Sequence, residues 1–168
     1  MKRRLAIGAA PAALAAIAVV AAGCGGGSQS GTTGPGYAAA GSARSVTVAT
    51  VSAAKTKLGT VLVDGRGRTL YLFEKDKGTA SSCSGACASI WPPLTTAAKG
   101  VAGSGLAAAK LGSIKRADGK REVTYAGHPL YTYAGDAKAG QTRGQGLDQF
   151  GAEWYVLAPS GHKIDGDS

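Results

Sequence analysis

The strongest constraint on the fold of this chain is that part of its sequence occurs twice. The segment Gly67-Arg-Thr-Leu-Tyr-Leu-Phe-Glu-Lys-Asp76 matches Gly127-His-Pro-Leu-Tyr-Thr-Tyr-Ala-Gly-Asp136 at a constant offset of 60 residues. Both copies follow the pattern G-x-x-L-Y-x-[FY]-x-x-D, and five coincident positions of specific type argue against a chance match. Internal repeats indicate duplicated structural units. We therefore expect two related units, at about residues 58–94 and 119–157.

Two further correspondences extend the match. Val63 falls on Val123 in the same register, and Trp91 corresponds to Trp154 if about three residues are inserted. Each copy is predicted to form a β-hairpin, because β-rich runs at 60–63 and 68–73, and again at 122–125 and 129–133, flank short turn sequences. A third hairpin signal is Asp118-Gly119, which follows the run at 111–116.

Successive side chains of a strand point to opposite faces, so the repeated aromatic residues are expected to share one face of the sheet. The two repeated aspartates follow each strand, where the chain turns into loops rich in Lys and Gly. They are either binding residues or turn residues whose carboxylates accept backbone N–H groups. The candidate binding residues are Tyr71, Phe73, Asp76, Tyr131, Tyr133 and Asp136.

The first 23 residues are predicted to be an export signal. A cationic start is followed by an uncharged stretch at 5–20, which is too short to cross a bilayer. Ala21-Ala-Gly-Cys24 resembles the lipobox of bacterial lipoproteins, in which lipid is attached to the cysteine thiol and cleavage occurs just before it. A doubly acylated Cys24, carrying palmitate-type chains, would hold the protein permanently at the extracytoplasmic face of the cell membrane. The alternative is an ordinary cleavage site with an incidental cysteine.

The rest of the chain is expected to be a tether and one domain. Residues 25–45 contain seven glycines, and with Cys24 they form a segment that cannot bury enough apolar area to offset its backbone entropy. Residues 46–168 are predicted to be a single, mainly β domain of the small α+β class. We expect two hairpin units related by an approximate twofold axis, one short helix near the cysteine pair, and Trp91 and Trp154 closing equivalent ends of the core.

These residues resemble those of a known family, the predicted bacterial lipoproteins with a repeated Y-x-[FWY]-x-x-D motif, described as a secreted repeat of unknown function. The resemblance covers roughly residues 58–157. It implies location and architecture, and it brings no reaction. The matching motifs are Tyr71-Leu-Phe-Glu-Lys-Asp76, Cys83-Ser-Gly-Ala-Cys-Ala-Ser-Ile-Trp-Pro-Pro-Leu94 and Tyr125-Ala-Gly-His-Pro-Leu-Tyr-Thr-Tyr-Ala-Gly-Asp136.

With Cys24 carrying lipid, Cys83 and Cys87 are left as a pair, which favours a disulfide in an exported protein. They lie in a segment that could form a short helix, capped at Ser82 or Ser84 and ending before the prolines. The alternative is a redox-active pair, or a copper site completed by His128, because two thiolates and an imidazole suit copper. The segment shows no βαβ pattern of a thioredoxin fold. The other histidine, His162, is expected to be solvated near a frayed C-terminus.

The sequence carries no G-x-S-x-G, P-loop, dinucleotide-binding or H-E-x-x-H motif, and its ten acidic residues include no close pair suited to acid–base chemistry. We therefore expect no enzyme activity and no cofactor. The formal charge is +9, three units of which lie in the first four residues, and single cations spread along the chain argue against nucleic acid as a partner. Such a surface suits anionic headgroups or wall polymers.

Together these observations predict a lipid-anchored envelope protein of unknown molecular activity that binds a ligand or partner without catalysis. The binding surface is expected to be the aromatic face with its two aspartate loops. The alternative function is copper binding or thiol redox chemistry at Cys83, Cys87 and His128.

Overall fold

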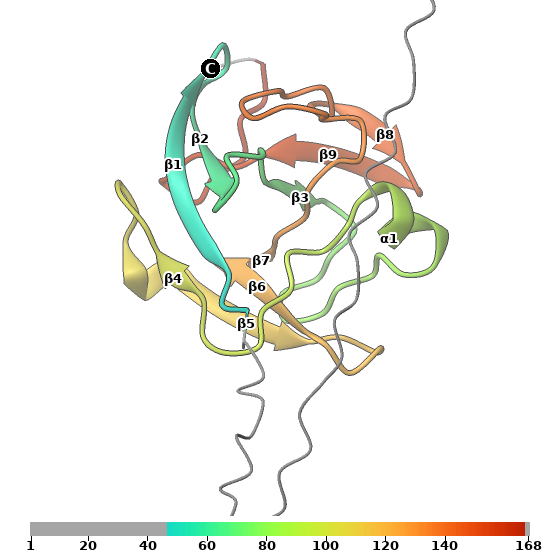
Figure 1. Cartoon of the computed structure of the whole chain (residues 1–168). Helices are drawn as coiled ribbons and strands as arrows, with labels where there is room; N and C mark the ends of the chain where they lie inside the picture. The colour runs from blue at the N-terminus through green and yellow to red at the C-terminus, as the bar shows by residue number, and fades with distance from the viewer. Residues whose placement is uncertain (1–46, 167–168) are drawn as a thin grey trace, which may run out of the picture. The chain divides into compact units, whose positions relative to one another are not determined.

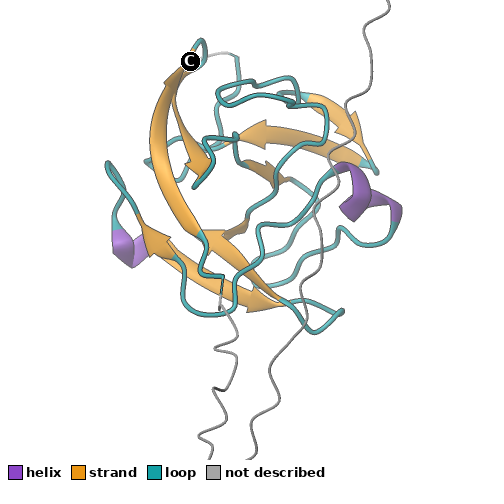
Figure 2. Cartoon of the chain, in the orientation of Figure 1, coloured by secondary structure: helices purple, strands orange, loops and turns teal. Residues whose placement is uncertain are grey.

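The computed structural model describes residues 47–166, so the predicted signal peptide (residues 1–23), Cys24 and the tether (residues 24–45) lie outside the described residues. The described part is mainly β, as predicted, with one short α-helix and one 3-10 turn (Figures 1 and 2). Its elements are β1 (Thr50–Thr56), β2 (Gly59–Asp64), β3 (Tyr71–Phe73), α1 (Ala86–Ile90), β4 (Val101–Ala102), η1 (Ala108–Lys110), β5 (Leu111–Lys115), β6 (Arg121–Tyr125), β7 (His128–Pro129), β8 (Leu147–Gln149) and β9 (Ala152–Val156).

The strands form three small sheets with the orders β2-β1-β4, β3-β9-β8 and β5-β6-β7. Each repeat begins with an antiparallel hairpin, which is β1–β2 in one copy and β5–β6 in the other. The β5–β6 hairpin turns at Asp118-Gly119, as predicted. The strand β1 was not predicted, because its sequence TVSAAKT lacks a run of large apolar side chains.

The two repeats exchange their C-terminal ends. Strand β3 of the first repeat pairs with β9 of the second, with Tyr71 opposite Val156. In the reciprocal place, Pro93 of the first repeat bridges to Tyr131 of the second. Each copy therefore completes its β-structure with a segment of the other copy, and this reciprocity gives the approximate twofold relation that the repeat predicts.

The backbones of Tyr71 and Tyr131 meet at the centre of this exchange. The Tyr71 N–H donates to the Tyr131 carbonyl at 2.8 Å, and the Tyr131 N–H donates back to the Tyr71 carbonyl at 3.0 Å. The approximate twofold axis passes between these two residues. The motif tyrosines are therefore the point at which the two repeats are joined.

The predicted match of Val63 with Val123 is wrong by one residue. The Leu70 N–H donates to the carbonyl of Leu62, whereas the Leu130 N–H donates to the carbonyl of Val123. Leu62 is therefore the structural equivalent of Val123. The offset changes from 60 to 61 residues there because the first hairpin loop is one residue longer than the second.

The alternation of side chains along the motif strands separates the core into two clusters. One cluster is mainly aliphatic, and its buried members include Leu70, Leu72 and Leu130. The other is aromatic and sulfur-containing, and it includes Tyr71, Phe73, Tyr131, both tryptophans and both cysteines of the pair. The prediction that the repeated aromatic residues share a face is confirmed, and that face is packed inside the protein.

Two local predictions are corrected by the structure. Helix α1 begins after Gly85 at φ 54° without a side-chain cap, and Ser84 contributes only its carbonyl, to the Cys87 N–H at 3.1 Å. Glycine takes this positive φ readily, so the helix starts where the backbone can turn rather than at a serine hydroxyl. Near the C-terminus, the Ala158 N–H donates to the His162 carbonyl at 2.9 Å, so His162 lies in an ordered turn and not in a frayed end.

Candidate functional site

The repeated tyrosines and aspartates are brought together, and they pair across the repeats. The Tyr71 hydroxyl donates to Oδ2 of Asp136 at 2.6 Å, and the Tyr131 hydroxyl donates to Oδ2 of Asp76 at 2.7 Å. Each motif aspartate therefore accepts a hydrogen bond from the tyrosine of the other copy. We call this pair of reciprocal bonds the Tyr–Asp exchange.

Each aspartate also holds the backbone of its own loop. Oδ1 of Asp136 accepts the Arg143 N–H at 2.9 Å, and Oδ1 of Asp76 accepts the N–H of Ser82 at 2.7 Å and its hydroxyl at 2.8 Å. These contacts are those of a turn residue. A single carboxylate thus fixes a loop with one oxygen and locks the other repeat with its second oxygen.

Both exchange tyrosines remain protonated over the physiological pH range. Burial raises the pKa of the Tyr71 hydroxyl, and the hydrogen bond to Asp136 raises it further. Burial and the nearby charge of Glu122 likewise raise the pKa of Tyr131. A protonated phenol is a hydrogen-bond donor, which is the role that the carboxylate partners require.

Four aromatic rings form a continuous stack beside the exchange. Phe73 stacks on Trp154 with ring centroids 4.1 Å apart, Trp154 stacks on Trp91 at 3.9 Å, and Trp91 packs against Tyr133 at 4.4 Å. The rings alternate between the first and second repeats along the stack. The prediction that the two tryptophans close equivalent ends of the core is wrong, because the exchange of C-terminal segments brings their rings face to face.

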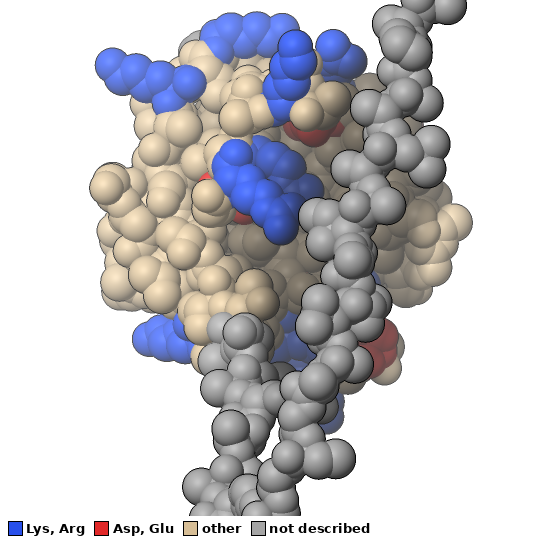
Figure 3. All heavy atoms as spheres, in the orientation of Figure 1, with Lys and Arg blue, Asp and Glu red and all other residues tan. Residues whose placement is uncertain are grey.

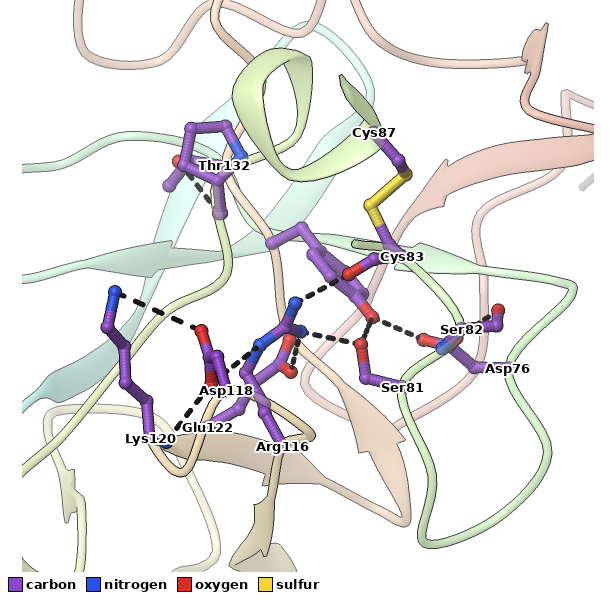
Figure 4. Close-up of polar contacts among 12 residues, drawn as sticks. Asp76, Ser81, Ser82, Cys83, Cys87, Arg116, Asp118, Lys120, Glu122 and Thr132 are labelled. Carbon is purple, nitrogen blue, oxygen red and sulfur yellow. Dashed lines mark hydrogen bonds and ion pairs between the residues drawn. A yellow bond between two sulfur atoms is a disulfide. The ribbon is translucent and has the colours of Figure 1, made fainter. Parts of the chain in front are cut away.

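A buried polar network, which the sequence did not predict, reaches the Asp76 side of the exchange (Figure 4). Nη1 of Arg116 donates to Oε2 of Glu122 and to Oγ of Ser81, both at 2.6 Å. Oγ of Ser81 lies 2.7 Å from the Tyr131 hydroxyl, which in turn donates to Asp76. Arg116 and Glu122 are isolated charged residues of the β5–β6 hairpin sequence, and no sequence motif marks them.

The two halves of the exchange differ in access to solvent. Asp136 is only 6% exposed, and its loop closes over Tyr71, whose hydroxyl accepts the Gly144 N–H at 3.2 Å. Asp76 is half-buried and borders a cleft of about 480 Å³. The other side chains that line this Asp76 cleft are Leu72, Phe73, Glu74, His128, His162 and Lys163.

All six candidate binding residues take part in the hydrogen bonds and ring contacts that join the repeats. Two of the six, Phe73 and Asp76, also line the Asp76 cleft. His128 lies in the cleft with Asp76, a juxtaposition that the sequence motif alone did not reveal.

Comparison with known families gives one match. A family model described as a secreted repeat of unknown function matches residues 52–95 and 112–158, which together are more than half of the chain. The chain belongs to this family. The two matched stretches begin within β1 and β5, and they end just beyond the segments that the secreted repeats exchange. No curated protein and no solved structure gave a significant match.

The predicted pairing of Cys83 with Cys87 is confirmed in this member of the secreted-repeat family. The two residues form a disulfide, and both are buried. The Cys83 carbonyl accepts a hydrogen bond from Arg116, which ties the disulfide segment to the buried network (Figure 4). Among residues 47–166, no group of three or more His, Cys, Asp or Glu side chains has an arrangement that could hold a metal ion.

Within residues 47–166, no helix is long and apolar enough to cross a bilayer.

The buried Glu122 predicts a pH dependence of stability. Burial raises its pKa from 4.5 to about 7, against the opposing hydrogen bond from Arg116. Because the pKa of Glu122 is higher in the folded than in the unfolded state, its protonation stabilises the fold. This stabilisation is complete below pH 4.5 and is lost as the pH rises through 7. We expect Glu122 to lower the free energy of unfolding by up to about 3 kcal/mol between these limits. Urea unfolding of wild type and Glu122→Gln at several pH values measures this effect, and identical pH profiles would contradict it.

Proposed function

We propose that this secreted-repeat protein is a non-enzymatic, lipid-anchored envelope protein that binds a ligand or partner at the Asp76 cleft. The proposal rests on a difference between the two copies of the motif. In one copy Asp136 is buried and contacts only other parts of the protein, whereas in the other copy Asp76 borders a cleft. A structural role alone would be met equally well by two closed copies.

The groups that line the cleft are suited to noncovalent recognition of a small polar ligand. Glu74 and Lys163 form an ion pair at the rim, with Oε1 and Nζ 2.5 Å apart. Burial lowers the pKa of His128, so its imidazole is neutral at pH 7 and has one donor and one acceptor nitrogen. The oxygens of Asp76 already accept three hydrogen bonds, so this carboxylate is a poor candidate for a catalytic base.

The chain contains two histidines, and both line the Asp76 cleft. Their imidazole NMR signals are therefore built-in reporters of the site. We expect the signals of His128 and His162 to shift when the labelled protein is titrated with soluble muropeptides or with the small-molecule fraction of the cell envelope. Lys163→Ala should weaken the response, whereas Lys138→Ala, the same substitution outside the cleft, should not. Unchanged histidine signals with every fraction would contradict a ligand site here.

The lipid anchor is proposed from the lipobox-like sequence at Cys24, and the description of the family as secreted is compatible with it. Anchoring there makes the extracytoplasmic face of the membrane the location of the protein, and the membrane itself its first partner. No nucleic-acid partner is proposed.

Substitution of Cys24 by alanine is expected to abolish attachment of lipid. The protein should then appear in the culture medium or accumulate unprocessed, because the thiol that carries the acyl groups is absent. Cell fractionation and metabolic labelling with an alkyne-tagged fatty acid measure both effects, with Cys83→Ser as the matched cysteine control. Unchanged membrane retention and labelling of Cys24→Ala would refute the anchor.

The alternative function, copper binding or thiol redox chemistry at Cys83, Cys87 and His128, requires reduction of the disulfide first. We expect the disulfide to be a structural bridge that closes a small ring, with a stabilising contribution of about 2 kcal/mol and a reduction potential below about −300 mV. Titration of the reduced protein with Cu(I) and equilibration in thiol redox buffers test this. A higher potential, or Cu(I) binding lost in His128→Ala, would favour the alternative instead.

A further inference from the structure

A second hollow surface lies apart from the Asp76 cleft. Two depressions, of about 360 and 450 Å³, share the lining residues Thr47 and Thr95 and therefore lie next to each other; we call the two together the groove. Arg66 and Arg68 line one end of this groove, and Lys120 and Arg121 line the other. None of the groove residues lines the Asp76 cleft, so the groove is a separate site.

The polar groups of the groove are mainly hydrogen-bond donors. Two of its cations have a protein partner for part of their donor capacity, because Nη1 of Arg121 donates to Oγ of Ser113 at 2.9 Å and Nζ of Lys120 lies 3.9 Å from Oδ2 of Asp118. Among residues 47–166, neither Arg66 nor Arg121 has a carboxylate within ion-pair distance. The one acidic residue in the lining, Asp64, is buried and neutralised by Arg68 at 2.8 Å. Within the same described range, the hydroxyl groups of Thr47 and Thr95 have no partner. Guanidinium and hydroxyl groups together are the donors that bind phosphate oxygens.

The charged residues that line the groove are mainly basic, with four cations and one carboxylate, that of Asp64. On the face of the domain shown in Figure 3, basic side chains are prominent and acidic atoms are visible only in small areas. Several of the chain's acidic residues are used inside the protein, where Asp64, Asp136 and Glu122 are buried. An anionic ligand would therefore meet little repulsion as it approaches the groove.

The spacing of charge along the groove limits the kind of anion. Cations stand at its two ends, and the middle, at Thr47 and Thr95, is polar but uncharged, with Pro93 and Leu94 beside it. A small anion bound in one depression would contact only the cations that line that depression. A linear polymer with charges separated by neutral hydroxylated carbon segments could place an anionic group at each end and its neutral part over the threonines.

We propose that this groove binds a linear phosphodiester polymer of the polyol phosphate type, as a contact between the domain and the cell wall. The site is independent of the Asp76 cleft, so a protein that binds no ligand at Asp76 could still bind the polymer here.

The test is fluorescence anisotropy with a labelled glycerol phosphate oligomer and the full exported chain in a non-ionic detergent. We expect saturable binding that weakens at high salt. The double variant Arg66→Ala/Arg121→Ala should bind at least tenfold more weakly. The control Lys75→Ala/Lys77→Ala has the same net charge but changes lysines outside the groove, and it should lose less than twofold. Thr95→Val, which changes no charge, should lose a few-fold.

Several outcomes would overturn the proposal. Equal losses in the two double variants would show general attraction to a basic surface. Equal competition by polyglutamate of the same length would remove the preference for phosphodiesters. Binding to phosphatidylglycerol vesicles that depends on Arg66 and Arg121, without binding to the oligomer, would assign the groove to the membrane. Near-UV circular dichroism of each variant confirms that the comparison is made between folded proteins.

Discussion

Replacing Trp154 with alanine is expected to lower the free energy of unfolding by about 4 kcal/mol. Its ring is fully buried between Phe73 and Trp91, and the ring of Tyr131 packs against it in a T-shaped arrangement at 86°. Removing it opens a cavity at the centre of the four-ring stack and breaks contacts with both repeats. Because domains of this size are stabilised by only about 5–15 kcal/mol, the variant should lose from about a quarter to about four fifths of its stability. Urea unfolding followed by far-UV circular dichroism measures the change.

The matched control for this variant lies in the same β8–β9 hairpin. Phe150 is 41% exposed and has a positive φ of 61°, which is unfavourable for a phenylalanine. Phe150→Gly removes an aromatic ring of the hairpin without opening the core, and it relieves the backbone. We expect stability to change by less than about 0.5 kcal/mol or to rise. A loss in Phe150→Gly as large as that in Trp154→Ala would contradict the role assigned to the stack.

The two motif aspartates are expected to differ in their contribution to stability although their sequence positions are equivalent. Asp136→Ala should lower the free energy of unfolding by about 3 kcal/mol, because it leaves the buried Tyr71 hydroxyl and the Arg143 N–H without their acceptor. Asp76→Ala should lower it by only about 1 kcal/mol, because water from the cleft can replace the lost carboxylate. Chemical unfolding of the two variants gives the comparison.

The control for this comparison is Asp148, an exposed aspartate of β8, whose substitution by alanine should change stability little. If Asp76→Ala proves as destabilising as Asp136→Ala, the Asp76 side is as closed as the Asp136 side. The divergence on which the proposed ligand site rests would then be absent.

Several features of the fold were predictable because they depend on local pattern. The alternation of Leu70, Tyr71, Leu72 and Phe73 assigns successive side chains to opposite faces, and the structure places them in two separate clusters. The even cysteine pair predicted the disulfide, and the turn sequence Asp118-Gly119 predicted a hairpin. In each case the residues that decide the structure are neighbours in the chain.

The partners in the Tyr–Asp exchange were not predictable in this way. A repeated Y-x-[FY]-x-x-D motif is the same sequence whether Tyr71 bonds Asp76 of its own copy or Asp136 of the other. The choice is made by long-range strand pairing, in which β3 takes β9 as its neighbour. The same long-range pairing determines that Glu122 is buried and that a cleft opens at only one of the two aspartates. Neither feature is indicated by the residues next to it in the sequence.

Two side-chain hydrogen bonds, from Tyr71 to Asp136 and from Tyr131 to Asp76, lock the two repeats together. Double-mutant cycles of unfolding free energy test this most directly. Tyr71→Phe and Asp136→Ala should be coupled by at least about 1 kcal/mol, since each removes the same hydrogen bond, whereas Tyr71→Phe and Asp76→Ala should add within about 0.5 kcal/mol. Additivity in the first cycle with coupling in the second would show that each tyrosine bonds the aspartate of its own copy, and would contradict the exchange.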